Sequence, residues 1–182
     1  MEADWEVEIG NEAPVIDACW EGFVDLRPAP EQATGLPETK DFPALAETLV
    51  RLNSQSSPVW TSKCDLWEPE AFDPDELDAP AGTGRCAIAC YIDLLPHTRR
   101  PWLGPAQAVD FCQQLGVTLR KVPLRRCRAD LVVRRACLAP DRQELGITAY
   151  LTACGPALAD ARAALASALA AFADALPAAA SP

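Results

Sequence analysis

The chain has 182 residues, of which 49% are hydrophobic and 23% charged, and its formal net charge is −10. This composition excludes disorder over the whole length, and a chain of this size can fold without a metal or disulfide staple. No run reaches the about 20 apolar residues that cross a bilayer, and the first ten residues do not resemble a signal peptide, so we expect a cytoplasmic protein without membrane contact.

Two β-rich runs open the chain. Trp5–Ile9 alternates apolar and acidic residues, which is typical of a strand with one solvated face. Val15–Leu26 is the second run, with Gly22 as a possible bulge. Because Gly10 and Pro14 stand between the runs, we expect the two strands to form a hairpin.

A loop, a helix and a strand come next. The Pro-rich segment 27–40 predicts a loop, 42–53 predicts a helix with one leucine stripe, and 59–67 predicts a strand. Segment 68–84 then holds six acids, three prolines and two glycines, so it predicts a solvated loop. A single helical turn is expected within this loop at Asp73.

The second half alternates strands and helices. Its first run is nearly all apolar, as in a central strand, and its last helix is rich in alanine. In order we predict strand 86–95, helix 105–115 capped by Gly116, strands 117–122, 128–138 and 146–153, a helix from 155 to 176, and a frayed tail over 177–182.

These elements predict the α+β class, with one mainly antiparallel sheet and three helices, at least two of them packed on it. We expect a single domain over residues 1–176. Residues 15–122 read strand, helix, strand, strand, helix, strand, which is the order of a ferredoxin-like sandwich. The pattern does not predict the order of the strands in the sheet.

Charge divides the chain. Residues 1–84 hold nineteen acids and four bases, residues 85–182 hold seven acids and twelve bases, and seven bases fall within 120–135. Either the halves attract each other, within a molecule or between copies, or the basic run meets an anionic partner. Nucleic acid is not expected, because the net charge is negative and no aromatic residue lies near the basic run for stacking.

The leading hypothesis is therefore a non-catalytic protein that binds another protein or itself through complementary acidic and basic surfaces, with a homo-oligomer expected. Three lysines against thirteen arginines, with many alanines, indicate a bacterial source. The candidate binding residues are Arg125, Arg126, Arg128, Arg134 and Arg135 on the basic side, and Asp17, Glu21 and Asp25 on the acidic side.

Cysteine chemistry is the second hypothesis, a thiol- or metal-dependent enzyme or sensor. The chain has eight cysteines, which we expect to be free thiols, and no Cys-x-x-Cys pair. Cys86 and Cys90 share one face of a predicted strand and are the candidate metal ligands. Cys127, between Arg126 and Arg128, is the candidate catalytic residue, because positive neighbours lower a thiol pKa. Burial in the core is the favoured interpretation of these cysteines, and no cofactor is expected.

The tryptophans raise a third possibility. Four of the five lie in the first half, where they could form a core, an interface or the lining of a ligand pocket. A small-ligand-binding module is thus a further alternative, with Trp5, Trp20, Trp60 and Trp67 as its lining.

Overall fold

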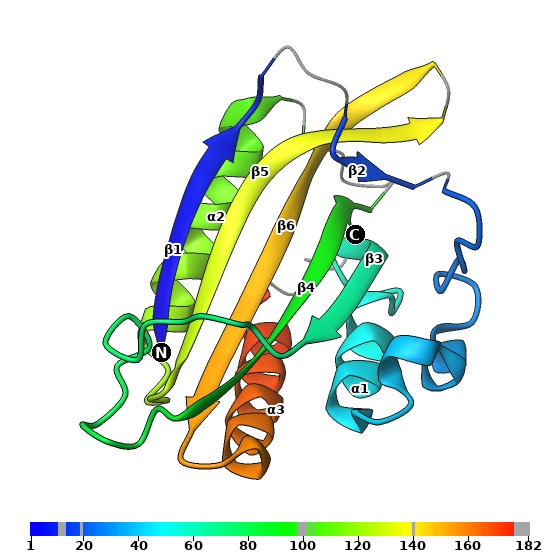
Figure 1. The fold of residues 1–182 in the computed structure, drawn as a ribbon. Coiled ribbons are helices and arrows are strands. Elements are labelled where there is room, and N and C mark those ends of the chain that lie inside the picture. Colours follow the sequence, from blue (N-terminus) through cyan, green and yellow to red (C-terminus); the bar gives the residue numbers. More distant parts are fainter. Residues whose placement is uncertain (11–13, 19, 98–101, 103, 140, 177–182) are drawn as a thin grey trace.

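The structure, a computed structural model, describes residues 1–10, 14–18, 20–97, 102, 104–139 and 141–176 (Figure 1). The strands are β1 (Glu2–Glu8), β2 (Ile16–Asp17), β3 (Val59–Trp67), β4 (Cys86–Pro96), β5 (Cys127–Ala139) and β6 (Arg142–Gly155). The helices are α1 (Pro43–Leu52), α2 (Pro105–Arg120) and α3 (Leu158–Ala175), and two 3-10 helices, η1 (Pro30–Gly35) and η2 (Pro37–Thr39), precede α1. The strands form one mostly antiparallel sheet in the order β1-β5-β6-β4-β3, with β2 beside β5. The predicted α+β class is confirmed.

The predicted hairpin of the first two strands is wrong. β1 and β2 both run parallel to β5, β1 beside Arg128–Arg134 and β2 beside Ala136–Cys137. The chain thus continues along β5 in one direction, and Gly10 and Pro14 interrupt the strand without reversing it. Of the described residues in the long strand expected at 15–26, two are in the sheet.

The strand predicted at 117–122 is also wrong, because most of this segment belongs to α2. The helix continues through Gly116, which was expected to cap it. One buried stripe, spaced by three or four residues, runs past this glycine and explains the helix; its members are Ala108, Cys112, Leu115 and Leu119, all at most 1% exposed. Residues 15–122 therefore lack the last strand of the predicted ferredoxin-like order.

The acidic loop between β3 and β4 agrees with its prediction. It contains no strand or helix, and a hydrogen-bonded turn lies where the helical turn was expected, with the N–H groups of Leu77 and Ala79 donating to the Pro74 carbonyl at 3.2 and 3.0 Å. The turn lies one residue beyond the Asp73 that was expected to start it.

All three helices contribute to one core cluster on a single face of the sheet; in Figure 1, α2 and α3 lie behind the strands and α1 lies beside the edge strand β3. Alternate residues of each strand point to this face, as strand geometry requires. The main core cluster accordingly takes Cys127, Ala129, Leu131 and Val133 from β5, Ile147, Ala149, Leu151 and Ala153 from β6, and Ile88, Cys90, Ile92 and Leu94 from β4.

On the opposite face, here called the open face, the described residues form a hydrophobic cluster at each of its two ends. At one end Ile16 packs against Leu95, and Gly146 leaves the room for it, since a Cβ there would lie 2.6 Å from Ile16 Cδ1. At the other end Leu77 packs on Ala87, where the acidic loop crosses in front of the strands (Figure 1). Among the described residues, no further hydrophobic cluster lies over the middle of the open face.

A buried asparagine joins α1 to the edge strand β3. Asn53 Nδ2 donates to Thr61 Oγ1 at 2.7 Å, and the Thr61 N–H donates to Asn53 Oδ1 at 3.0 Å. Both residues are at most 5% exposed. The pair holds the strand at the β-bulge between Thr61 and Cys64.

Replacement of this asparagine tests the link. Asn53→Ala leaves the buried Thr61 N–H without its acceptor, so we expect the free energy of unfolding in urea to fall by about 2 kcal/mol. Ser54→Ala is the control, because the Ser54 hydroxyl bonds to Ser56 on the surface and its loss should change the value by less than about 0.5 kcal/mol. A loss for Asn53→Ala as small as the control's would contradict the link.

Candidate functional site

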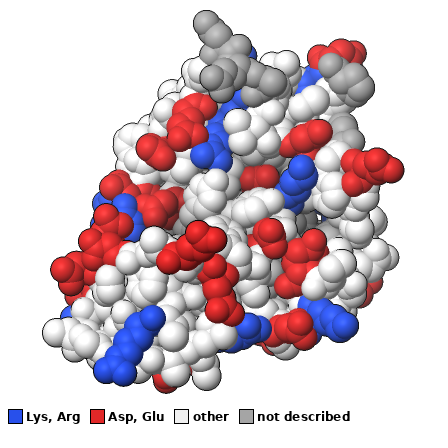
Figure 2. Space-filling model, in the orientation of Figure 1, with Lys and Arg blue, Asp and Glu red and all other residues white. Residues whose placement is uncertain are grey.

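Side chains from four strands meet in the uncovered middle of the open face. The register places Asp130 of β5 opposite Tyr150 of β6, Tyr150 opposite Tyr91 of β4, and Tyr91 opposite Asp65 of β3. Residues opposite one another share a face, so all four side chains lie on the open face. We call these four residues the central strip. Carboxylates are spread over this side of the molecule (Figure 2).

Three aromatic rings form a row along the strip. Trp67 lies two residues beyond Asp65 on β3 and therefore on the same face. The ring centroids of Trp67 and Tyr91 are 6.2 Å apart, as are those of Tyr91 and Tyr150. These distances are typical of interacting aromatic pairs. Trp67 is 38% exposed, so the row is reachable from solvent at its β3 end.

Arg134 closes the row at its other end. Its guanidinium donates to Tyr150 Oη at 2.9 Å and to Glu8 of β1 at 2.8 Å, and lies 5.6 Å from the centroid of the Tyr150 ring. The Arg134 side chain is only 15% exposed. Its charge is thus balanced within the molecule, and its place on the ring shows how a cation can lie against this row.

A buried carboxylate lies next to the strip on β4. Asp93 is 5% exposed and accepts a hydrogen bond from the Thr148 hydroxyl at 2.7 Å. Burial raises the pKa of Asp93 to about 6, although Thr148, Arg134 and Lys63 oppose the shift. Burial, with Asp93 and Asp65 as further causes, raises the pKa of Tyr91 to about 12. Asp93 and Asp65 thus disfavour a further negative charge at Tyr91.

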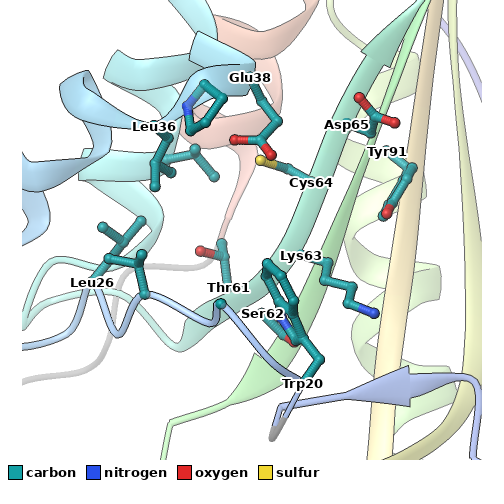
Figure 3. Close-up of a pocket in the computed structure, with 14 residues that line it drawn as sticks. Trp20, Leu26, Leu36, Glu38, Thr61, Ser62, Lys63, Cys64, Asp65 and Tyr91 are labelled. Carbon is teal, nitrogen blue, oxygen red and sulfur yellow. The ribbon is translucent and has the colours of Figure 1, made fainter.

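A cavity of about 550 Å³ adjoins the strip at the free edge of β3 (Figure 3). We call it the edge pocket. One wall is the β3 segment Thr61–Asp65, and the other comes from Trp20, Leu26, Leu36 and Glu38 of the chain before α1. Its lining combines apolar side chains with a few charged ones, which is the usual composition of a ligand pocket.

The charges in the edge pocket are mainly negative. Glu38 and Asp65 contribute carboxylates, and burial, followed by these two carboxylates, raises the pKa of the Cys64 thiol to about 12. Lys63 is the cation among the lining residues, and its Nζ lies 5.1 Å from the centroid of the Trp20 ring. Lys63 forms no ion pair with any described residue.

The predicted basic residues are mostly paired within the molecule. The pairs are Arg125 with Asp78 at 2.7 Å, Arg128 with Asp130 at 2.8 Å and with Asp4 at 3.9 Å, and Arg134 with Glu8 at 2.7 Å. Three of these pairs join the acidic half to the basic half. In the described part of the chain, Arg126 and Arg135 form no ion pair.

Of the predicted acidic residues Asp17, Glu21 and Asp25, Asp17 alone is in a strand. Glu21 lies in an exposed turn. Asp25 pairs with its neighbour Arg27 at 2.8 Å, and the hydrogen bonds from Arg27 hold the pKa of Asp25 below its usual value. Asp25 thus has a partner other than the arginine run.

The cysteines that the structure describes do not form the predicted reactive or metal-binding group. Cys127 is 1% exposed, and burial raises its pKa to about 11, so the neighbouring Arg126 does not make it a thiolate. Cys86 and Cys90 lie on β4, but the described residues hold no group of three metal-ligating side chains. The seven described cysteines are free thiols.

The tryptophans do not gather in one pocket. Trp20 lines the edge pocket and Trp67 lies in the aromatic row, whereas Trp60 is buried beside Phe23 and Trp5 packs against the core from β1. Trp20 Nε1 is buried and has no hydrogen-bond partner among the described residues.

Sequence reasoning missed Glu38 and both tyrosines of the strip. A signal for the tyrosines exists, because polar residues at every second position interrupt two apolar strands, as Tyr91 and Asp93 do in β4 and Thr148 and Tyr150 do in β6. Glu38 has no such signal, since a turn of η2 brings it to the edge of β3.

Comparison with protein-family models, curated proteins and solved structures finds no match to this chain. Among the described residues, no helix has both the length and the apolar character needed to span a membrane.

Asp93 predicts a specific pH dependence. Since its pKa rises from 3.8 to about 6 on folding, the unfolded chain loses the proton first as the pH rises, and stability falls between about pH 4 and pH 6. Above this window Asp93→Asn should therefore be more stable than the parent by up to about 3 kcal/mol, with no such gain below pH 4. Urea unfolding at several pH values measures the difference. Asp65→Asn, at an exposed position, is the control. A stability difference between Asp93→Asn and the parent that does not change with pH would contradict the assignment.

Proposed function

We propose that this chain is a non-catalytic binding protein that recognises a basic protein partner through the central strip and the adjoining edge pocket. The observation that carries the proposal is the aromatic row Trp67, Tyr91 and Tyr150, which lies on an uncovered sheet face among carboxylates. Aromatic residues are enriched in protein interfaces and at their hot spots.

The charges support a basic partner. Lysine and arginine side chains bind both to carboxylates and to the faces of aromatic rings, and the strip offers the two groups side by side. Glu38, Asp65 and Asp93 contribute negative charge around Tyr91 and the edge pocket. The net charge of −10 also steers a basic partner toward the molecule.

A second copy is the other partner that the charge division predicts. The pairs that Arg125, Arg128 and Arg134 form inside the molecule support it less, because they leave fewer bases to bind the acids of another copy. Thiol chemistry receives no support from the raised pKa of Cys127. Free thiols at the seven described cysteines support a reducing compartment such as the cytoplasm.

An octalysine peptide tests the proposal, with octaglutamate as its opposite. We expect the full chain to bind octalysine and not octaglutamate, by fluorescence anisotropy of the labelled peptide. Trp67→Ala and Asp65→Asn should each weaken binding by about 3- to 10-fold. The control is Glu47→Gln on the exposed side of α1, which removes the same charge away from the strip and should change affinity by less than about twofold.

Equal affinity of all variants would show that octalysine binds only through net charge, and would contradict the proposal. Measurement of the oligomeric state at low and high salt tests the alternative that the partner is a second copy of this chain. A dimer that dissociates at high salt would favour self-association through complementary charges over a separate basic partner.

A further inference from the structure

The edge pocket runs along the free edge of β3. Five consecutive residues, Thr61–Asp65, line it, whereas a cavity on one face of a strand would be lined by alternate residues only. β3 is the last strand of the sheet, so its outer side has no neighbouring strand among the described residues. The pocket therefore lies where a further strand would lie.

Side chains satisfy two main-chain groups of this edge strand. The Thr61 N–H donates to Asn53 Oδ1 at 3.0 Å, and the Leu66 N–H donates to the carboxylate of the adjacent Asp65 at 2.7 Å. Side-chain partners of this kind are what an edge strand uses in place of a neighbour. The carbonyl of an added strand could accept the hydrogen bond of the Leu66 N–H. The Asp65 carboxylate would then be free to bind a lysine or arginine side chain.

The two sides of the pocket differ in character. Figure 3 shows Glu38 and Cys64 on one side of β3, with Leu26 and Leu36 beyond them, and Asp65 and Tyr91 on the other side. The first side is thus largely apolar with one carboxylate, and the second adjoins the acidic strip. An extended peptide points its alternate side chains to these two sides.

A slender segment suits this edge better than a folded copy does. The wall formed by Trp20, Leu26 and Glu38 stands beside β3 in every copy, so two copies would have to bring two such walls together before their β3 edges could meet. Five residues of β3 run for about 16 Å, and the cavity volume of about 550 Å³ admits a short segment of chain.

We propose that the edge pocket binds an extended basic segment of the partner, which adds to the sheet as a strand beside β3. The segment alternates apolar and basic residues, with the apolar ones toward Leu26 and Leu36 and the basic ones toward Asp65 and Tyr91. Main-chain hydrogen bonds hold it, and the alternation selects it, as in other cases of strand addition. This inference rests on the proposed function and specifies the form of the partner.

The probe is the capped hexapeptide Lys-Val-Lys-Val-Lys-Val, used with the full chain. We expect it to bind at least about fivefold more tightly than Lys-Lys-Lys-Val-Val-Val, which has the same charge without the alternation. Asp65→Asn should weaken binding by about threefold or more, and Glu47→Gln should not. Amide hydrogen exchange should slow in residues 59–67 on binding, while exchange in β5 stays unchanged.

Two N-methylated forms of the hexapeptide test the main-chain contact. One carries methyl groups on the valine amides and the other on the lysine amides, which belong to opposite edges of an extended peptide. One form should lose at least about tenfold in affinity while the other stays within about twofold of the parent. Equal binding by both forms, or equal loss in both, would overturn strand addition, and the proposed function would still stand if binding depended on Trp67 and Asp65. No binding of any basic peptide would overturn both.

Discussion

The packing of all three helices on one side of a single sheet is the constraint on which the rest of this structure depends. Strand residues alternate between faces, so a sheet covered on one side divides each strand into a dry and a wet set. The dry set builds the main core, and the wet set includes the half-buried Tyr91 and Tyr150, whereas their open-face neighbour Asp93 is buried. The proposed binding surface is the part of the wet set that no other segment covers.

The charge asymmetry of the sequence has a structural counterpart. β1, whose open-face residues are acidic, lies parallel to β5, which carries Arg128 and Arg134, and the two halves of the chain meet in ion pairs there. Most of these pairs are partly solvated and add little stability each. In the proposed function these pairs matter for recognition, because they neutralise the bases and leave an excess of carboxylates on the open face.

Much of the fold could be predicted, because helix stripes and strand alternation are local signals. The failures were at places where only tertiary contacts decide. Gly10 and Pro14 predict a turn, but whether the chain reverses there depends on β5, more than a hundred residues away. At 117–122 the β-branched residues favour a strand, whereas burial of Leu119 against the sheet favours helix.

The candidate site was harder to predict than the fold. The arginine run was conspicuous in the sequence, yet its main role is to pair with Glu8, Asp78 and Asp130. The residues of the strip come from four strands, and only the sheet order brings them together. Polar residues at every second position of β4 and β6 do indicate a wet face, but not which residues lie opposite them.

Hydroxyl-radical footprinting of the isolated full chain tests most directly whether the middle of the sheet is uncovered. Trp60 and Trp67 lie on the same strand and are 4% and 38% exposed, so each is a control for the other. We predict rapid oxidation of Trp67 and measurable oxidation of Tyr91 and Tyr150, with Trp60 protected. Protection of Trp67 and both tyrosines to the level of Trp60 would mean that the open face is covered, and would contradict the account.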